Sequence, residues 1–348
     1  MKKLESYYKY FERLVATPSP SGFEGQAQRL FMDYGRRLTK DVTLDKFGNA
    51  VIHLPKPGKP KLMLSAHIDE IGFVVKYIDD NGYLSFLPIG GIDAMLVPGA
   101  RLAVHHGKNS FLGVVVRRPV HLMNEAERAK LLVEDLWLDC GFTSKDHALK
   151  SIDIGDPVTF TTDPTWMSDT ILCSRSCDNK IGNMILMEVI RRLKGSDIPY
   201  DTYFVSTTQE EIGLRGGITA ALMIKPDMAV IIDATHATDY PTANKKTHGD
   251  IRLGAGPSIS ISPDSNVELR QQIIHTAVEI GLPLQKEAHP NASGTEARAI
   301  QLQRGGINST VVSFPVRYMH SPSEIVHKDD INATITLLCH FCLTTRIK

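Results

Sequence analysis

The sequence predicts an α/β fold in which helices flank a mostly parallel sheet, with a small β-rich barrel or sandwich inserted into it. Strand-like and helix-like stretches alternate in residues 1–71 and again in 164–348, as in parallel sheets covered on both faces. Between them, residues 72–163 consist of short strand-like pieces separated by Gly and Pro turn signals, which is typical of a small barrel or sandwich. We therefore expect an α/β domain made of residues 1–71 and 164–348, and an inserted domain at 72–163.

The N-terminal part begins with two expected helices. Apolar residues recur at helical spacing over 3–16, where Pro18 and Pro20 end the pattern, and a second helix is expected over about 21–38. Strand-like runs follow at 41–45, 49–54 and 61–66. The last run is continuously apolar and ends directly before His67, as a buried strand of an α/β sheet does.

The inserted segment contains short strand-like pieces with turns between them. These strands are expected at 73–78, 83–87, 101–105 and 113–116. The dipeptides Asn81-Gly82 and Pro98-Gly99 mark two of the turns. One helix is expected inside the insertion, over residues 124–136.

After the insertion, helices and strands alternate to the end of the chain. Helices are expected at 179–194 and 216–222, and strands at 202–207 and 227–232. Further α/β elements are expected at 258–262, 265–280, 284–287, 295–302 and 309–314. A final helix is expected over about 328–343. This alternation is the reason for predicting a largely parallel sheet.

Charge and composition argue against several classes of protein. Lys+Arg and Asp+Glu are equal at 39 each in 348 residues, so the overall charge does not favour nucleic acid or an anionic membrane as a partner. No apolar run reaches about 18 residues, and the charged N-terminus lacks the apolar core of a signal peptide. We expect no nucleic-acid partner and no association with a membrane.

The cysteines indicate a reducing environment. They are few and odd in number, at positions 140, 173, 177, 339 and 342. Cys339 and Cys342 lie in an apolar, helix-like run, where buried free thiols are a better interpretation than metal ligands. Reduced thiols suggest a cytoplasmic location.

Residues with metal-ligating side chains follow the ends of several expected strands. They are His67 and Asp69 after 61–66, Glu210 and Glu211 after 202–207, Asp233 after 227–232 and His320 after 309–314, with Asp178 at the start of the helix 179–194. Ligand sites of α/β sheets lie at the carboxyl ends of the strands. We therefore expect these side chains to meet at one edge of the sheet.

Each of these residues also has an ordinary interpretation. Asp178 could cap the helix that follows it, Asp233 could be a turn residue, and His320 could lie in an ordinary loop. Glu210 and Glu211 could belong to a solvated loop. Consecutive residues of an extended chain point in opposite directions, however, so one of these carboxylates could bind metal while the other faces the substrate. The whole set together favours a shared site.

The charges of this set suit two divalent metal ions. Two such ions bring four positive charges, Asp178, Glu211 and Asp233 bring three negative ones, and one hydroxide completes the balance. Asp69, two residues after His67, could accept the second ring proton and orient the imidazole. Mixed carboxylate and imidazole ligands suit Zn, with Co or Mn as alternatives. Metal-dependent hydrolysis is the chemistry that this set predicts.

An ordered series of short motifs resembles a known family. The segments are 21–24, 66–72, 178–182, 210–216, 233–239, 249–254, 294–297 and 317–322. Together they resemble the cocatalytic metallo-aminopeptidases that include the TET aminopeptidases and the bacterial glutamyl or deblocking aminopeptidases. The resemblance covers nearly the whole chain and implies an aminopeptidase that acts on peptides with a free N-terminus.

The resemblance also implies a role for each site residue. One metal would be held by His67, Asp178 and Asp233, and the other by Asp178, Glu211 and His320. Glu210 would act as the general base and then as the acid that protonates the leaving amine. Asp69 would orient His67, and a cis peptide bond would follow Asp178.

The same resemblance implies a homo-oligomer. The inserted domain would be a dimerisation domain, and dimers could assemble further into a dodecamer. Two alternative functions stay open at this point. One is a carboxypeptidase or N-acyl amino acid hydrolase that uses the same metals, and the other is a non-catalytic peptide-binding assembly scaffold. A scaffold would be expected to have lost ligands, whereas all five ligands and Glu210 are present.

Departures from the family pattern concern substrate preference more than the ligands. Asn179 and Lys180 stand where many relatives have aspartate and arginine, and Glu296 replaces the aspartate of a Gly-Thr-Asp-Ala motif. The bulky cation Arg298 follows shortly after. Three arginines could favour acidic N-terminal residues or could equally be ion-paired structural groups, namely Arg215, Arg298 and Arg317.

Overall fold

An eight-stranded sheet forms the centre of the α/β part of the structure, a computed structural model that describes residues 7–125 and 131–344. In spatial order its strands are β1 (Val42–Leu44), β2 (Ala50–Leu54), β12 (Asp201–Thr207), β3 (Lys61–His67), β13 (Met228–His236), β16 (Asn308–Val316), β14 (Ser258–Ile261) and β15 (Gln285–Ala288). The four central strands, β12, β3, β13 and β16, pair in parallel, while β2 and β14 join them antiparallel. The predicted mostly parallel sheet is confirmed.

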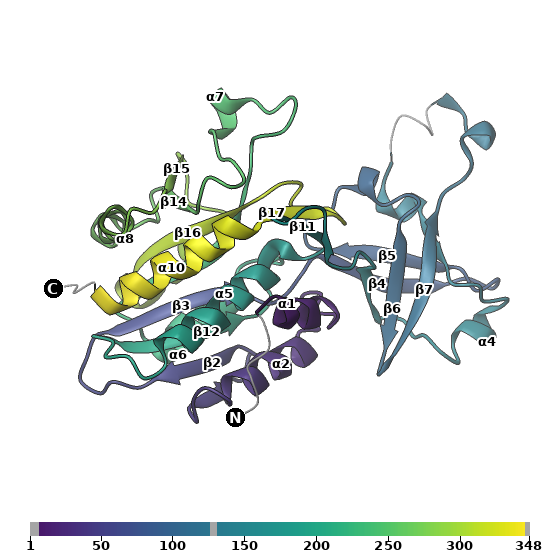
Figure 1. The fold of residues 1–348 in the computed structure, drawn as a ribbon. Coiled ribbons are helices and arrows are strands. Elements are labelled where there is room, and N and C mark those ends of the chain that lie inside the picture. Colours follow the sequence, from purple (N-terminus) through teal and green to yellow (C-terminus); the bar gives the residue numbers. More distant parts are fainter. Residues whose placement is uncertain (1–6, 126–130, 345–348) are drawn as a thin grey trace.

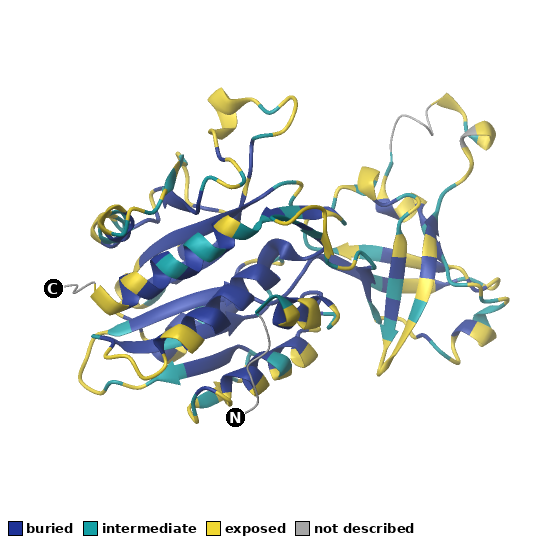
Figure 2. Cartoon of the chain, in the orientation of Figure 1, coloured by how far each residue is buried: buried dark blue, intermediate teal, exposed yellow. Residues whose placement is uncertain are grey.

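Helices cover both faces of this sheet (Figure 1). One face packs against α1 (Tyr7–Val15), α2 (Gly25–Gly35), α5 (Cys177–Leu193), α8 (Val267–Glu279) and α10 (Lys328–Thr344). The other face packs against α6 (Arg215–Ile224) and α9 (Ala297–Ile300). Side chains alternate along a strand, so Leu62 and Leu64 enter the first core while Met63 enters the second. Figure 2 shows the buried central strands between these layers.

A closed six-stranded barrel lies beside the sheet (Figure 1). Its strands are β4 (Gly72–Ile78), β5 (Leu84–Ile89), β8 (Trp137–Asp139), β7 (Asn109–Val116), β6 (Arg101–His106) and β9 (Pro157–Phe160). The barrel has its own hydrophobic core, which includes Phe73, Phe86 and Leu102. The predicted β-rich insertion is therefore present, and it is a barrel. All six strands fall inside the predicted insertion 72–163, whose outer limits stay a prediction.

Short elements complete the described ranges. A three-stranded sheet is made of β10 (Thr165–Trp166), β11 (Ile171–Ser174) and β17 (Glu324–His327). The short helices are α4 (Lys145–Ala148) and α7 (Lys245–His248), and the 3-10 turns are η1 (Ala94–Leu96), η2 (Val120–Leu122), η3 (Val133–Asp135) and η4 (Gln303–Gly305).

Glu125 is helical, but the helix expected over 124–136 is wrong for residues 131–136. Residues 126–130 of that range lie outside the described residues. Beyond them, Leu132 is extended, and the backbone makes only one 3-10 turn at Val133–Asp135. The reason is that Val133 and Leu136 are taken up by the barrel core, which satisfies their apolar spacing without a helix.

Two simpler expectations can also be compared with the structure. Cys339 and Cys342 are buried free thiols, as predicted. Within the described ranges, no helix is long and apolar enough to cross a bilayer. The cytoplasmic location stays a prediction.

Candidate metal centre

Three parallel strands deliver the candidate ligands to one edge of the sheet. His67 is the last residue of β3 and pairs in register with Thr207, the last residue of β12, three residues before Glu210. In β13, Ile231 pairs with Ser65, so that Asp233 lies level with His67. The remaining ligands come from the first turn of α5 and from the loop after β16. The expected convergence at the carboxyl edge is therefore what the fold produces.

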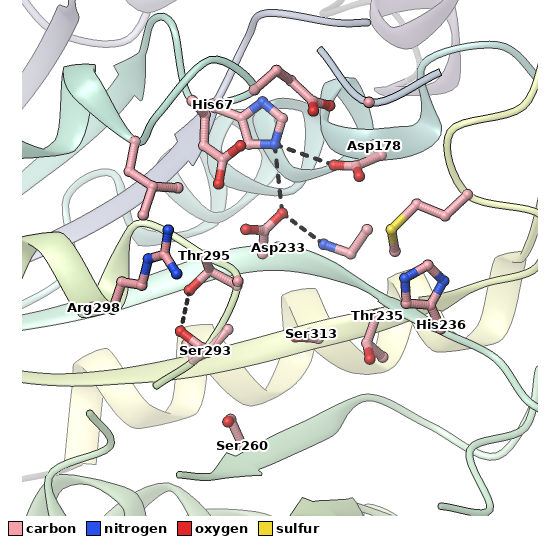
Figure 3. Close-up of a pocket in the computed structure, with 18 of the residues that line it drawn as sticks. His67, Asp178, Asp233, Thr235, His236, Ser260, Ser293, Thr295, Arg298 and Ser313 are labelled. Carbon is pink, nitrogen blue, oxygen red and sulfur yellow. Dashed lines mark hydrogen bonds and ion pairs between the residues drawn. The ribbon is translucent and has the colours of Figure 1, made fainter. Parts of the chain in front are cut away.

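The five predicted ligands form two groups that share Asp178. In the first group (Figure 3), His67 Nε2 lies 3.1 Å from Asp178 Oδ1 and 3.6 Å from Asp233 Oδ1. In the second, His320 Nε2 lies 3.5 Å from Asp178 Oδ2 and 3.3 Å from Glu211 Oε1. Within each group, one ligand atom from every residue lies within 4.8 Å of the others. The peptide bond between Asp178 and Asn179 is cis, as the resemblance implied.

The donor set fits divalent cations. Imidazole and carboxylate donors are what Zn, Co and Mn accept. Buried Oε1 of Glu211 accepts no hydrogen bond within the described ranges, although His320 Nε2 lies close to it. The ion pairs that the described residues make with Asp178, Glu211 and Asp233 all come from histidines, and none comes from lysine or arginine. These carboxylates therefore have lone pairs and negative charge left for a cation.

The pKa values of three acids of the site are raised. Burial raises the pKa of Glu210 well above its ordinary value; His67 opposes this shift, and the charges of Asp233 and Glu211 add to it. Burial likewise raises the pKa of Glu211 and of Asp233. A cation bound among these carboxylates would favour their charged forms.

The histidines respond in the opposite sense. Burial alone would lower the pKa of His67, but the nearby charge of Glu210 and hydrogen bonds to Asp178 raise it well above its ordinary value. Burial would also lower the pKa of His320, yet its contacts with Asp178 and Glu211 raise it to about 11. In Asp178 the two imidazoles outweigh burial and lower the pKa. Protons on the rings thus partly stand in for the positive charge that this site attracts.

Asp69 holds the backbone of the two glutamates. Its Oδ1 accepts a hydrogen bond from the Glu210 amide and its Oδ2 accepts one from the Glu211 amide, both at 3.1 Å. Ser21 Oγ donates to the same carboxylate at 2.6 Å. His67 Nδ1 lies 3.1 Å from the backbone oxygen of Asp69 and 3.5 Å from Oδ1. The orienting contact is thus made more closely by the main chain of Asp69 than by its side chain.

Sequence reasoning missed several buried residues that support these ligands. Glu324 accepts hydrogen bonds from the amides of Asp178 at 3.0 Å and of His320 at 2.9 Å. Asn179 Nδ2 donates to Asp233 Oδ1 at 3.0 Å, and Asn183 Nδ2 donates to the backbone oxygen of His67 at 2.5 Å. The one available signal was position, since Glu324 lies four residues after His320.

A cavity of about 470 Å³ opens beside these residues. Glu210 and Glu211 line it. Hydroxyl side chains such as Thr235, Ser293 and Ser313 line it as well (Figure 3). Glu296 lies outside the lining. It is buried, its Oε2 accepts a hydrogen bond from Thr207 Oγ1 at 2.9 Å, and burial raises its pKa to about 8. Most of the lining residues are polar or charged, but apolar atoms make up more of the exposed wall, so the cavity suits a substrate with both polar and apolar groups.

The three arginines have different environments. Arg317 makes a bidentate ion pair with Asp239 at 2.7 and 2.6 Å, so it is a structural group. Arg215 donates to Gln209 Oε1 at 2.6 Å and lies over the ring of Phe47. Arg298 lines the cavity, and its side chain has no hydrogen bond or ion pair with any described residue. Arg298 is therefore the arginine whose charge is available to a substrate.

These features define a class of protein before any comparison is made. The sheet carries a doubled carboxylate–imidazole site and an adjoining acid, Glu210, beside a cavity. This is the architecture of a metal-dependent hydrolase. The chain matches the model of the M42 glutamyl aminopeptidase family over residues 48–337 and belongs to that family.

Individual relatives agree with this assignment. The chain is 33% identical over 334 residues to a lysyl aminopeptidase of Pyrococcus furiosus, with 95% of each chain covered. The structure of a TET aminopeptidase from a marine-sediment Thaumarchaeota archaeon superposes with a TM-score of 0.93 at 28% identity, covering 98% of this chain and 97% of the other. A TET peptidase of Pyrococcus horikoshii, described as assembling into a tetrahedron or a large octahedral shell, has a TM-score of 0.87 at 26% identity, with 98% and 100% covered.

The comparisons decide among the functions that the sequence left open. The chain is an aminopeptidase of a metal-dependent family, and its residues include groups placed to bind metal. The non-catalytic scaffold and the carboxypeptidase or N-acyl amino acid hydrolase are set aside, because the family and its named relatives are aminopeptidases.

Proposed function

We propose that this aminopeptidase binds two divalent ions per chain and that Asp178 bridges them. The ligands would be His67, Asp178 and Asp233 for one ion and Asp178, Glu211 and His320 for the other. The observation that supports this most is Asp178 itself, whose Oδ1 faces His67 and whose Oδ2 faces His320. Zn is the proposed ion, with Co or Mn as alternatives, because the donors are imidazoles and carboxylates.

The side chains around the ions have separate tasks. When bound, two divalent ions would polarise the scissile carbonyl and make a water molecule acidic enough to lose a proton near neutral pH. Glu210 lines the cavity but belongs to neither group of ligands, so its carboxylate is free to accept that proton. Glu210 would then deliver the proton to the leaving amine. Asp69 would keep Glu210 in place through the amide hydrogen bond described above.

The proposed substrates are peptides with a free N-terminus, and we propose neither a nucleic-acid partner nor a membrane partner. We also propose a homo-oligomer built from dimers, with residues 72–163 as the dimerisation domain. Apolar side chains exposed on the barrel side support this, among them Met95, Leu112 and Ile154, which are 70%, 58% and 55% exposed. One TET structure similar to this chain is described as a dodecamer, and the Pyrococcus horikoshii relative as a tetrahedron or a large octahedral shell. A dodecamer or larger shell is therefore the state to look for by light scattering.

Two substitutions separate the proposed roles. Glu210→Gln should retain about two metal ions per chain and lose about 10²–10⁴-fold in kcat, because it removes only proton transfer. Asp178→Ala should lose both metal and activity, because it removes a ligand from both groups. Metal content by elemental analysis and turnover of aminoacyl-anilides measure the two effects. Full turnover by Glu210→Gln rejects its role as base, and two ions in Asp178→Ala reject the bridge.

A further inference from the structure

A second buried carboxylate stands behind the ligands without belonging to either group. Glu324 is the first residue of β17 and is 1% exposed. Its Oε2 accepts a hydrogen bond from the amide of Asp178 and its Oε1 accepts one from the amide of His320. Within the described ranges no lysine or arginine pairs with it, so these backbone amides are its polar partners. Burying a carboxylate without a cation costs free energy, so a functional role for Glu324 is worth considering.

The two amides belong to segments whose backbone is not in a regular helix or strand conformation. Asp178 has non-helical angles at the start of α5, and His320 has a φ of +62° in the loop between β16 and β17. Glu324 is anchored in a strand, because β17 pairs with β11 and Glu324 faces Ser174 in the register. A strand residue therefore ties together two irregular segments, each of which carries a proposed ligand.

The same arrangement occurs at Asp69. One carboxylate there spans the amides of Glu210 and Glu211, and Glu324 spans those of Asp178 and His320. Between them, the two carboxylates hold the main chain of four site residues.

We infer that Glu324 is a positioning residue that sets the spacing of Asp178 and His320, and hence the affinity of the Asp178–Glu211–His320 group for its metal ion. The inference rests on the proposed two-metal function. Glu324 acts through backbone amides and touches neither the proposed ion nor the substrate. A carboxylate suits the task because both of its oxygens accept, whereas an amide offers one acceptor and one donor. In Glu324→Gln, the side-chain amide group would oppose one of the two backbone N–H groups.

The matched control is Asp330, a buried acid in α10 that makes the same kind of contact elsewhere. It is 1% exposed, and its carboxylate accepts hydrogen bonds from the amides of Gly254 and Gly256, both at 2.7 Å. Asp330 does not line the cavity. Asp330→Asn therefore shows what the loss of such a carboxylate–amide contact does to the protein in general, without changing the metal centre.

The experiment measures the affinity of the full-length, metal-free protein for Co²⁺ and Zn²⁺ by equilibrium dialysis, with the Co²⁺ absorption spectrum as a second readout. Glu324→Gln should weaken the Asp178–Glu211–His320 site by about 10–100-fold, as loss of a supporting hydrogen bond to a ligand commonly does. The other site shares only Asp178 with it and should weaken less. Its kcat should recover at high metal concentration. Asp330→Asn should bind both ions like wild type.

Each outcome decides something. Wild-type affinity and spectrum at both sites in Glu324→Gln overturn the inference, as does equal weakening in Asp330→Asn. A wild-type protein that binds fewer than two ions overturns the proposed function instead. Where Glu324→Gln does not fold, Glu324→Asp replaces it. That variant keeps both oxygens on a shorter side chain, and the same weakening of one site is expected of it, while unchanged affinity contradicts the inference.

Discussion

Asp69 and Glu70 are adjacent, acidic and buried, yet they enter opposite electrostatic environments. Glu70 meets cations supplied by the chain, since Lys180 Nζ lies 2.7 Å from Oε1 and Arg175 pairs with Oε2. Burial would raise the pKa of Glu70, but these two charges lower it to about 2. Asp69 instead faces the cluster in which burial raises the pKa of Glu210 and Glu211. The chain thus neutralises the charge of Glu70 with its own cations, whereas it leaves the charge of the carboxylates near Asp69 for an external cation.

Two arginines repeat this contrast with the sign reversed. Arg317 is matched by both oxygens of Asp239. Arg298 lines the cavity and has no such partner within the described ranges. Paired charges thus stabilise the fold, while unpaired charges border the cavity where a ligand can pair with them.

The largest expected effect is on the paired side. Glu70→Gln leaves the buried cations Arg175 and Lys180 without their shared carboxylate, and breaking such a buried pair costs about 3–5 kcal/mol of unfolding free energy. Urea unfolding measures it. The control is Asp33→Asn, which breaks the exposed pair with Arg36 and should cost no more than about 1 kcal/mol. If Glu70→Gln and Asp33→Asn lost the same free energy of unfolding, the ion pairs of Glu70 would contribute no more than an exposed pair, and the contrast would fail.

The sequence could predict those site residues that directly follow a recognisable element of the chain. His67, Asp233 and Glu210 were recognisable because each follows an apolar strand, and parallel strands end at one edge. Glu324 was missed although it lies four residues after His320, because its role also depends on a contact with the amide of Asp178, 146 residues away, that no spacing reveals. In the same way, the neutralisation of the Glu70 carboxylate depends on Arg175, 105 residues away.

The fold shows the same limit. Gly and Pro turns mark the inserted strands, but the closure of the barrel depends on pairings such as β4 with β9, whose partners are far apart in the chain. The helix expected over 124–136 was wrong at Val133 and Leu136 because the barrel core took up these side chains. Local apolar spacing predicts burial, whereas the surface that buries a residue decides its backbone conformation.

On the unpaired side, metal removal should lower stability. A cation that binds the folded site at about 100 times its Kd adds about 2.7 kcal/mol to the free energy of unfolding. Dialysis against a chelator should therefore lower that free energy by a comparable amount, and added Zn²⁺ should restore it. In Asp178→Ala the chelator should have little effect, because both ligand groups are broken. A wild-type protein that is equally stable with and without chelator would contradict the idea of a charge left for an external cation.

Arg298 tests the same idea with a substrate in place of a metal. Arg298→Ala should lower kcat/KM for a peptide with an acidic N-terminal residue about tenfold, or about 1.4 kcal/mol, relative to one that begins with leucine. Arg298→Lys keeps the charge and serves as the control, which should retain most of the preference. Equal losses of kcat/KM on the acidic and the leucyl substrate would show that Arg298 does not recognise the charge of the substrate.

The smallest expected effect is a difference in how the two regions respond to acid. In the folded protein the pKa of Glu70 is about 2, below its ordinary value of 4.5, so its stabilisation is fully present above about pH 4.5 and is lost as the pH falls towards 2. Between about pH 6 and about pH 4, metal-free wild type should therefore lose about 1 kcal/mol more stability than metal-free Glu70→Gln. The acids of the metal centre have the opposite sign, because a raised pKa makes the folded state bind protons first, but both proteins carry them and their effect cancels. Urea unfolding at several pH values measures the difference. Parallel curves for the two proteins would mean that Glu70 is no better neutralised than the acids of the metal centre. The distinction between the two clusters would then rest on geometry alone.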